Sequence, residues 1–135
     1  MKVVVDTSVW SLALRRHKEA EDGYVELFKE LISDGRVVLL GAIRQEVLSG
    51  IRYIGQYEKL KTNLRAFPDL KLKADDYEVA ASFYNLCRQQ GIQGSNTDYL
   101  ICSVASRRNY EILTTDKDFD NFAEHLSIKL LKPSG

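Results

Sequence analysis

The fold is decided by a stretch near the start of the chain, Lys2-Val3-Val4-Val5-Asp6-Thr7-Ser8, in which an apolar strand ends on an acidic residue. A second stretch repeats this pattern late in the chain, Glu111-Ile112-Leu113-Thr114-Thr115-Asp116. Continuous apolar runs are typical of parallel strands that are buried on both faces. In open α/β sheets, ligands bind beyond the carboxyl ends of such strands. The two stretches therefore predict two aspartates at one ligand-binding edge, and they indicate a cation site.

The composition is that of a single soluble domain, and we expect one domain over residues 1–135. No apolar run approaches the roughly 20 residues of a membrane span, and the early first strand leaves no room for a signal peptide. We therefore expect a cytoplasmic protein. The 19 basic and 19 acidic residues balance, which counts against broad, nonspecific nucleic-acid binding but allows a local basic rim. Cys87 and Cys102 are predicted to be free, buried thiols.

Strand and helix patterns alternate along the chain, and turn signals such as Gly50 and Gly91 separate them. This alternation predicts an α/β fold, with a parallel sheet that carries helices on both faces. The pattern also predicts that Val79, Phe83 and Leu86 face inward and that Asn96 is a helix N-cap. Strands are expected at 2–5, 36–40, 111–114 and 128–131, and helices at 8–16, 20–34, 42–50, 53–66, 75–90, 97–109 and 117–124.

Two further acids occur in apolar helix stripes. Glu46 lies three residues after Ile43 and next to Val47, in the predicted inward stripe of its helix. Asp98 lies at a helix N-terminus above a stripe that contains Ile101. A carboxylate on an inward stripe costs several kcal/mol unless it is paired or bound to a cation. The positions of both acids therefore point to a shared ion.

Each acid also has a purely structural interpretation. Asp6 can end its strand in an Asx turn, and Glu46 can pair with Arg44 or Arg52. Asp98 can complement a helix dipole, and Asp116 or Asp118 can cap the next helix. Taken together, however, clustered carboxylates repel one another, and a divalent cation removes this repulsion. An all-oxygen set favours Mg²⁺ or Mn²⁺. Nearby hydroxyls that can orient the carboxylates belong to Thr7, Ser8, Thr97, Thr114 and Thr115.

Four segments in this order resemble the PIN domain family, and most closely the VapC-type toxins of toxin–antitoxin pairs. They are Val5-Asp6-Thr7-Ser8-Val9-Trp10, Arg44-Gln45-Glu46-Val47-Leu48-Ser49-Gly50, Asn96-Thr97-Asp98-Tyr99-Leu100-Ile101-Cys102-Ser103-Val104-Ala105 and Leu113-Thr114-Thr115-Asp116-Lys117-Asp118-Phe119. Each segment alone is only moderately specific for the family. The ordered set of four, which spans nearly the whole chain, is a strong signal.

The resemblance implies a three-layer α/β/α sandwich and a Mg²⁺- or Mn²⁺-dependent endoribonuclease that hydrolyses RNA. Asp6, Glu46 and Asp98 take the positions of the three acids most typical of the family. Asp116 takes the more variable fourth position, which Asp118 can share or replace.

The resemblance also implies a small antitoxin partner and a homodimer. Candidate phosphate contacts are Arg15, Arg16, Arg44, Arg52 and Lys117; Trp10 and Tyr99 are expected in the core or against RNA bases; and neither His17 nor His125 is given a catalytic role.

Other functions are weighed against this one. A non-toxin PIN nuclease in RNA processing and a catalytically inert metal- or nucleic-acid-binding module both fit the same motifs. A haloacid-dehalogenase-like phosphohydrolase needs a second aspartate two residues after Asp6, where this chain has Ser8. A response-regulator receiver needs an acidic pair after the first strand, and Asp6 is followed by hydroxyl residues instead.

Overall fold

The valine run near the start of the chain forms a central strand of a parallel sheet in the computed structural model, which describes residues 1–14 and 23–134. β1 (Val3–Val5) is completely buried and pairs on one side with β2 (Val37–Val38) and on the other with β3 (Glu111–Leu113). β4 (Lys129–Leu130) pairs with β3 and completes the order β2-β1-β3-β4. All of these pairs are parallel, so the predicted sheet is confirmed.

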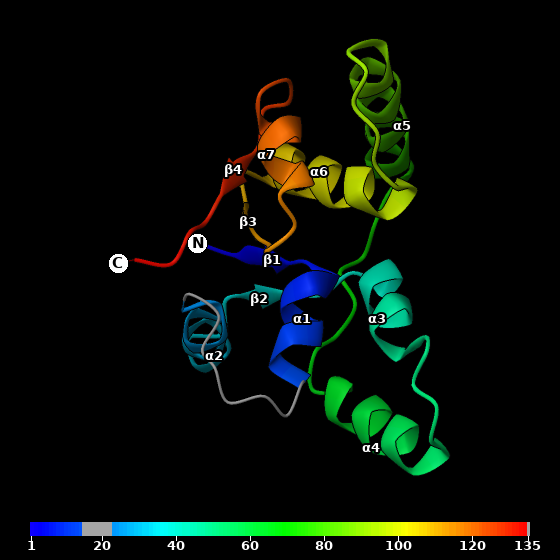
Figure 1. Cartoon of the computed structure of the whole chain (residues 1–135), viewed down its shortest axis with the longest axis vertical. Coiled ribbons are helices and arrows are strands. Elements are labelled where there is room, and N and C mark those ends of the chain that lie inside the picture. The colour runs from blue at the N-terminus through cyan, green and yellow to red at the C-terminus, as the bar shows by residue number, and fades with distance from the viewer. Residues whose placement is uncertain (15–22, 135) are drawn as a thin grey trace.

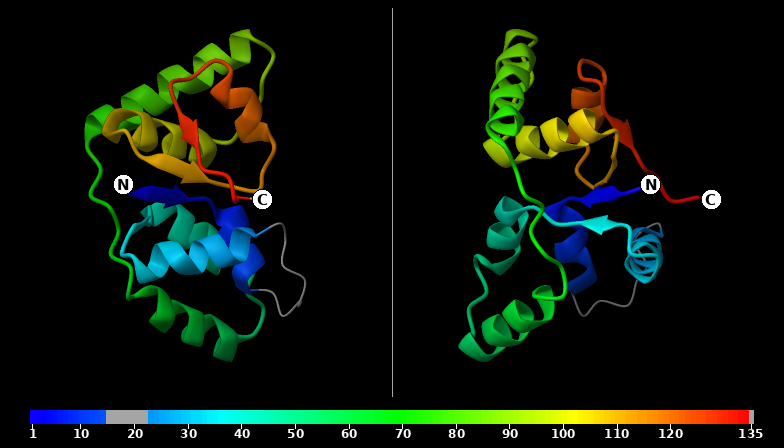
Figure 2. Two further views of the ribbon diagram at one scale, coloured as in Figure 1. Left: turned by 90° about the vertical axis from the view of Figure 1, so that its left-hand side faces the viewer. Right: turned by 180° about the vertical axis from the view of Figure 1, so that it is seen from behind.

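Helices cover both faces of the sheet, as predicted, and make three layers (Figures 1 and 2). One layer contains α1 (Thr7–Leu14), α2 (Tyr24–Ser33), α3 (Gly41–Leu48) and α4 (Ile54–Leu64), and the other contains α5 (Ala74–Gln89), α6 (Asn96–Arg108) and α7 (Asp118–Ala123). Most bounds lie within a few residues of the prediction. Residues 15–22, where the first two predicted helices end and begin, lie outside the described residues. No helix in the described ranges combines the length and the apolar character that a membrane crossing requires.

The register of β1 against β3 sets the carboxyl edge of the sheet. Val5 pairs with Leu113, and the Asp6 amide donates to the Leu113 carbonyl at 2.9 Å. The next residue on each strand, Asp6 and Thr114, therefore leaves the sheet at the same level. α1 begins directly after Asp6, whose carbonyl accepts the Val9 amide at 3.0 Å.

The core confirms some side-chain predictions and corrects others. Trp10 and Tyr99 are only 5% and 1% exposed, so both belong to the core. Cys87 and Cys102 are free and buried, as predicted. Leu86, however, is 40% exposed rather than inward. The buried residues of α5 are Asp76, Ala80 and Cys87.

The inward face of α5 is set by a buried aspartate. Asp76 is fully buried, and its carboxylate accepts bonds from the guanidinium groups of Arg107 and Arg108 at the end of α6. The Lys73 amide donates to the same carboxylate at 2.8 Å, and the Ser103 hydroxyl donates to the Asp76 carbonyl at 2.7 Å. The bonds to the carboxylate, with those of Arg108 first, hold the pKa of Asp76 well below its usual range despite burial. The buried face of α5 therefore runs through Asp76, Ala80 and Cys87 instead of through Leu86.

We expect Asp76→Ala to lower the free energy of unfolding at pH 7 by about 3–5 kcal/mol, because it leaves two arginines without their buried partner. Urea unfolding followed by circular dichroism measures the change. Asp75→Ala is the matched control, since the Asp75 side chain is 68% exposed and its ion pair with Arg107 is longer, at 3.5 Å. The control should lose less than about 1 kcal/mol.

The same substitution should also change the response to acid. The folded-state pKa of Asp76 lies below the unfolded value of about 3.9. Its stabilisation is therefore present above about pH 4 and is lost as the pH falls below that value. The stability difference between the native chain and Asp76→Ala should shrink over that range. A difference that stays constant down to the acid transition would contradict the ion-pair assignment.

Candidate functional site

The candidate site is built around Asp6, which is 6% exposed at the end of β1. Its Oδ2 atom accepts hydrogen bonds from the Ser8 hydroxyl at 2.7 Å and the Thr114 hydroxyl at 2.8 Å. The Ser8 amide lies 3.4 Å from the same oxygen, which is the Asx-type contact that the sequence allows. All these bonds reach Oδ2, and no described residue donates to Oδ1.

The two hydroxyls that hold Asp6 are themselves held by the backbone that follows β3. The Thr115 amide donates to the Ser8 hydroxyl at 3.0 Å, and the Asp116 amide donates to the Thr114 hydroxyl at 3.0 Å. Each hydroxyl thus donates a hydrogen bond to Asp6 and accepts one from a backbone amide. The Ser8 and Thr114 hydroxyls also lie 3.2 Å apart, but both of their hydrogens are already donated to Asp6. This network joins the ends of β1 and β3.

Asp116 enters the site through this network and also caps a helix. Its Oδ1 atom accepts the Asp118 amide at 2.9 Å, directly at the start of α7. The predicted helix-capping bond of Asp116 is therefore present. The other oxygen of its carboxylate accepts no hydrogen bond from the described residues. The Asp118 side chain is exposed and makes no hydrogen bond with the described residues.

Asp98 lies in the first turn of α6, where it is paired with Ser95. The Asp98 amide donates to the Ser95 hydroxyl at 3.1 Å, and the Ser95 amide donates to Asp98 Oδ2 at 3.0 Å. This capping box makes Ser95 the N-cap, so the prediction of Asn96 was wrong; the Ser-x-x-Asp spacing was the signal. Burial raises the pKa of Asp98, the Ser95 bonds lower it in part, and the charges of Asp6 and Asp116 raise it further. Asp98 is therefore electrostatically coupled to both acids.

Glu46 differs from its predicted setting. Ile43 and Val47 are buried, whereas Glu46 is exposed. At about 100° per residue, position 46 lies about 60° from Ile43 and about 100° from Val47, outside the buried stripe. Its carboxylate nevertheless accepts a 2.6 Å hydrogen bond from the Thr7 hydroxyl, next to Asp6. The prediction that Glu46 faces inward was wrong, although the side chain does lie against the start of α1.

The arginines and the threonine that were predicted to lie near the acids have other partners or none among the described residues. The Arg44 guanidinium pairs with Asp69 at 2.8 Å and donates to the carbonyls of Leu64 and Phe67, so it fastens the end of α4. Arg52 lies over the Tyr53 ring, 6.0 Å from its centroid. Among the described residues, the Thr97 side chain makes no hydrogen bond to an acid. Arg15, Arg16 and His17 lie outside the described residues.

The acids share an edge but do not form a closed cage. Across residues 1–14 and 23–134, no three His, Cys, Asp or Glu side chains form a group that could hold a metal ion as they stand. A cation still fits the chemistry of the edge, because Asp6 and Asp98 each have an oxygen that no described residue binds and their charges are not neutralised nearby. Mg²⁺ usually takes only one or two carboxylates and keeps several waters, so it does not require a closed cage.

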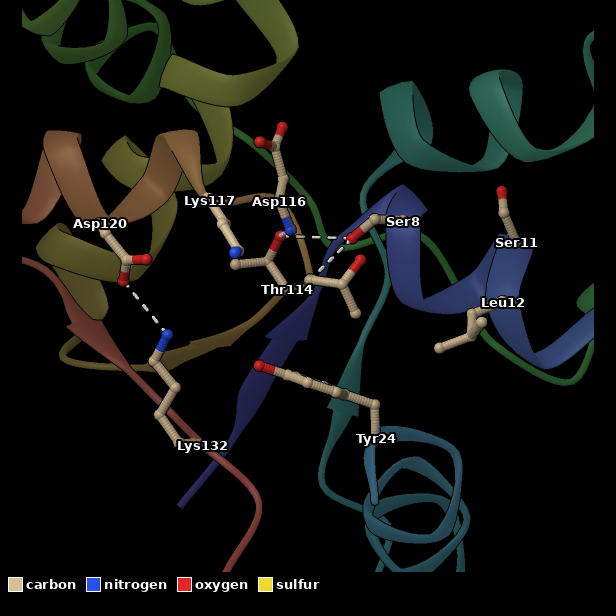
Figure 3. A pocket seen from close by; sticks show the side chains of 10 residues that line it. Ser8, Ser11, Leu12, Tyr24, Thr114, Asp116, Lys117, Asp120 and Lys132 are labelled. Atoms are coloured by element: carbon tan, nitrogen blue, oxygen red, sulfur yellow. Dashed lines mark hydrogen bonds and ion pairs between the residues drawn. The ribbon is translucent and has the colours of Figure 1, made fainter. Parts of the chain in front are cut away.

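A cavity of about 450 Å³ opens beside this edge (Figure 3). It shares Ser8, Thr114 and Asp116 with the network, and its far walls come from α1, α2, α7 and the residues after β4. The sequence pattern gave no indication of Ser11, Tyr24 or Lys132, which also line it. None of these three belongs to a motif segment, and only the fold brings them to the edge.

Comparisons with known proteins agree with this architecture. The family model described as "PIN domain" matches residues 3–125. Among solved structures, FitAcB from Neisseria gonorrhoeae superimposes with a TM-score of 0.75 at 18% identity and covers 97% of each chain. VapBC2 from Rickettsia felis, bound to a DNA fragment from its promoter, gives 0.76 at 19% identity over 98% of each chain.

A third solved structure extends the likeness to another organism. VapBC-5 from Mycobacterium tuberculosis gives a TM-score of 0.67 at 20% identity, over 97% of this chain and 98% of that one. At these identities the structural likeness shows a shared fold. A comparison with curated protein sequences gave no match.

We expect Thr114→Val to lower the free energy of unfolding by about 1.5–3 kcal/mol, because it removes a buried hydrogen bond to a charged group. Urea unfolding measures the loss. Thr115→Val is the matched control: its side chain is exposed, and its only bond in this network comes from its backbone. Equal stability of the two variants would contradict the bridging role of Thr114.

Proposed function

Because the chain belongs to the PIN domain family, we propose that it is a Mg²⁺- or Mn²⁺-dependent endoribonuclease and the toxin of a VapC-type toxin–antitoxin pair. The observation that carries this proposal is the carboxylate edge, where the Thr114 hydroxyl joins Asp6 to the backbone of Asp116 and the charges of Asp6 and Asp116 raise the pKa of Asp98. The full-length likeness to VapBC structures supports the toxin assignment. A small antitoxin, a homodimer and a cytoplasmic location are parts of the same proposal.

In this proposal, Asp6, Glu46, Asp98 and Asp116 hold the cation. When bound, a divalent cation stabilises charge on the phosphate oxygens and makes water a better nucleophile near neutral pH. Water as the nucleophile leaves a 5′-phosphate and a 3′-hydroxyl, and it does not need the 2′-hydroxyl of RNA. A preference for RNA therefore depends on the residues around the edge rather than on the acids.

The residues of the chain would supply orientation. The hydroxyls of Ser8 and Thr114 fix Oδ2 of Asp6 and leave Oδ1 for a ligand. Thr7 holds Glu46, and Ser95 holds one oxygen of Asp98. Each acid is thus tied to the backbone or to a hydroxyl by one oxygen, an arrangement that lowers the entropic cost of positioning it for catalysis.

We expect Asp6→Asn to reduce RNA cleavage by more than about 100-fold, since even the outer partners of metal sites contribute about 10–100-fold. Cleavage of a structured RNA in Mg²⁺ or Mn²⁺, with the ends of the fragments mapped, measures the loss. Asp75→Asn is the control, because Asp75 is exposed on α5. Cleavage by Asp6→Asn at the native rate, with an unchanged circular dichroism spectrum, would refute the mechanism.

We also expect Mn²⁺ at millimolar concentration to raise the melting temperature of the native chain by several degrees, because ligand binding to the folded state stabilises it. Asp98→Asn should lose most of this rise. Absence of any rise or binding heat in the native chain would favour the inert module. If cleavage persists but growth inhibition on expression is absent, the non-toxin PIN nuclease becomes the better assignment.

A further inference from the structure

The cavity beside the acids contains lysines as well as carboxylates, because Lys117 and Lys132 line it together with Asp116 and Asp120. Asp116 lies between the cavity and the acidic edge, and its carboxylate points away from Tyr24 and Lys132 (Figure 3). The cavity is therefore reached from the same edge of the sheet, yet the Asp116 carboxylate is turned out of it. A polymer that crosses the acids can extend into the cavity without a break, because the Thr114–Asp116 segment is shared by both.

The wall on the α7 side of the cavity carries two lysines and one aspartate, Asp120. Lys117 and Lys132 both line it, and both are exposed. Lys132 pairs with Asp120 at 3.1 Å, and each of these side chains is about half exposed, so the pair is weak and open to exchange for another anion. Within the described residues, Lys117 makes no ion pair. This wall therefore suits a phosphate group, which lysine contacts as a point charge.

The opposite wall is aromatic and carries hydroxyls. Tyr24, at the start of α2, is half-buried against the core, and its ring extends toward Lys132 (Figure 3). Ser11 of α1 lines the same cavity. Single-stranded RNA is recognised by stacking its unpaired bases on aromatic rings and by hydrogen bonds to their edges.

We propose that this cavity binds the nucleotide next to the scissile phosphate of single-stranded RNA, with its base against Tyr24 and its phosphate at Lys117 and Lys132. This inference rests on the proposed function, since it takes the substrate class of the acidic edge as RNA. It assigns to the cavity the recognition that the acids do not supply. Stacking on Tyr24 requires an unpaired base, so the cavity would select unpaired segments.

The test measures binding of a fluorescein-labelled, unstructured decaribonucleotide to the full chain carrying Asp6→Asn, at several salt concentrations and constant Mg²⁺. Lys117→Gln and Lys132→Gln should each weaken binding and reduce the slope of log K against log salt by about 0.7. Lys59→Gln on α4 is the matched control, because Lys59 is exposed and does not line the cavity. This variant should bind RNA with the same affinity, and the same slope of log K against log salt, as the chain that carries Asp6→Asn alone.

The aromatic wall has its own pair of variants. Tyr24→Phe should bind within about twofold of the background, whereas Tyr24→Leu should bind about 5–150-fold more weakly. Because Tyr24 also packs against the core, thermal unfolding verifies that each variant is folded, and the lysine variants test the cavity independently. If the lysines matter but Tyr24→Leu binds as tightly as Tyr24→Phe, the cavity is a bare anion site and the base assignment is overturned.

The two proposals fail in different ways. If Lys117→Gln and Lys132→Gln bind RNA like Lys59→Gln, or if no RNA binds, the cavity assignment is overturned, whatever the native chain cleaves. If binding depends on both lysines and Tyr24 but the native chain cleaves no RNA in Mg²⁺ or Mn²⁺, the cavity is an RNA site and the nuclease assignment fails instead.

Discussion

The parallel pairing of β1 with β3 is the constraint on which the candidate site depends. It places Asp6 and Thr114 side by side where the two strands leave the sheet, although 108 residues separate them in the chain. The hydrogen bond between them then ties the start of α1 to the segment that carries Asp116. A shift of one residue in this pairing would turn Thr114 to the other face of the sheet and leave Asp6 without its donor.

Two buried aspartates are stabilised in different ways. Asp76 is neutralised by two guanidinium groups, and it joins α5 to α6. Asp6 is nearly as buried, yet its side-chain donors are neutral hydroxyls. A buried carboxylate without a cationic partner is costly. Asp6 lacks a cationic partner at the edge of the sheet, where a bound ion would offset the cost of burial. Asp76, in the helix layer, has its charge offset by the two arginines.

The Thr114–Asp116 segment lies between two kinds of surface. On one side lie carboxylates that raise the pKa of Asp98, and on the other Lys117, Lys132 and Tyr24 line a cavity together with Asp120. In the proposed function, an RNA strand would use both kinds of surface: acids to hold a cation at the reacting phosphate, and lysines and an aromatic ring to hold the neighbouring nucleotide. Chemistry and recognition would then fall to adjacent but different side chains.

The sequence by itself determined the parallel sheet, the helices on its two faces and the edge at which Asp6 and Asp116 emerge, because the strand runs and helix periods are local patterns. It also pointed to Asp98, although it misplaced the N-cap by one residue. Only the tertiary structure decided that Glu46 bonds to Thr7 beside Asp6 and that Arg44 is occupied by Asp69 and backbone carbonyls. Tyr24 and Lys132 likewise have no local pattern that marks them. Their meeting at one cavity depends on how α2 and the chain after β4 pack around the sheet, and long-range packing of this kind leaves no periodic trace in the sequence.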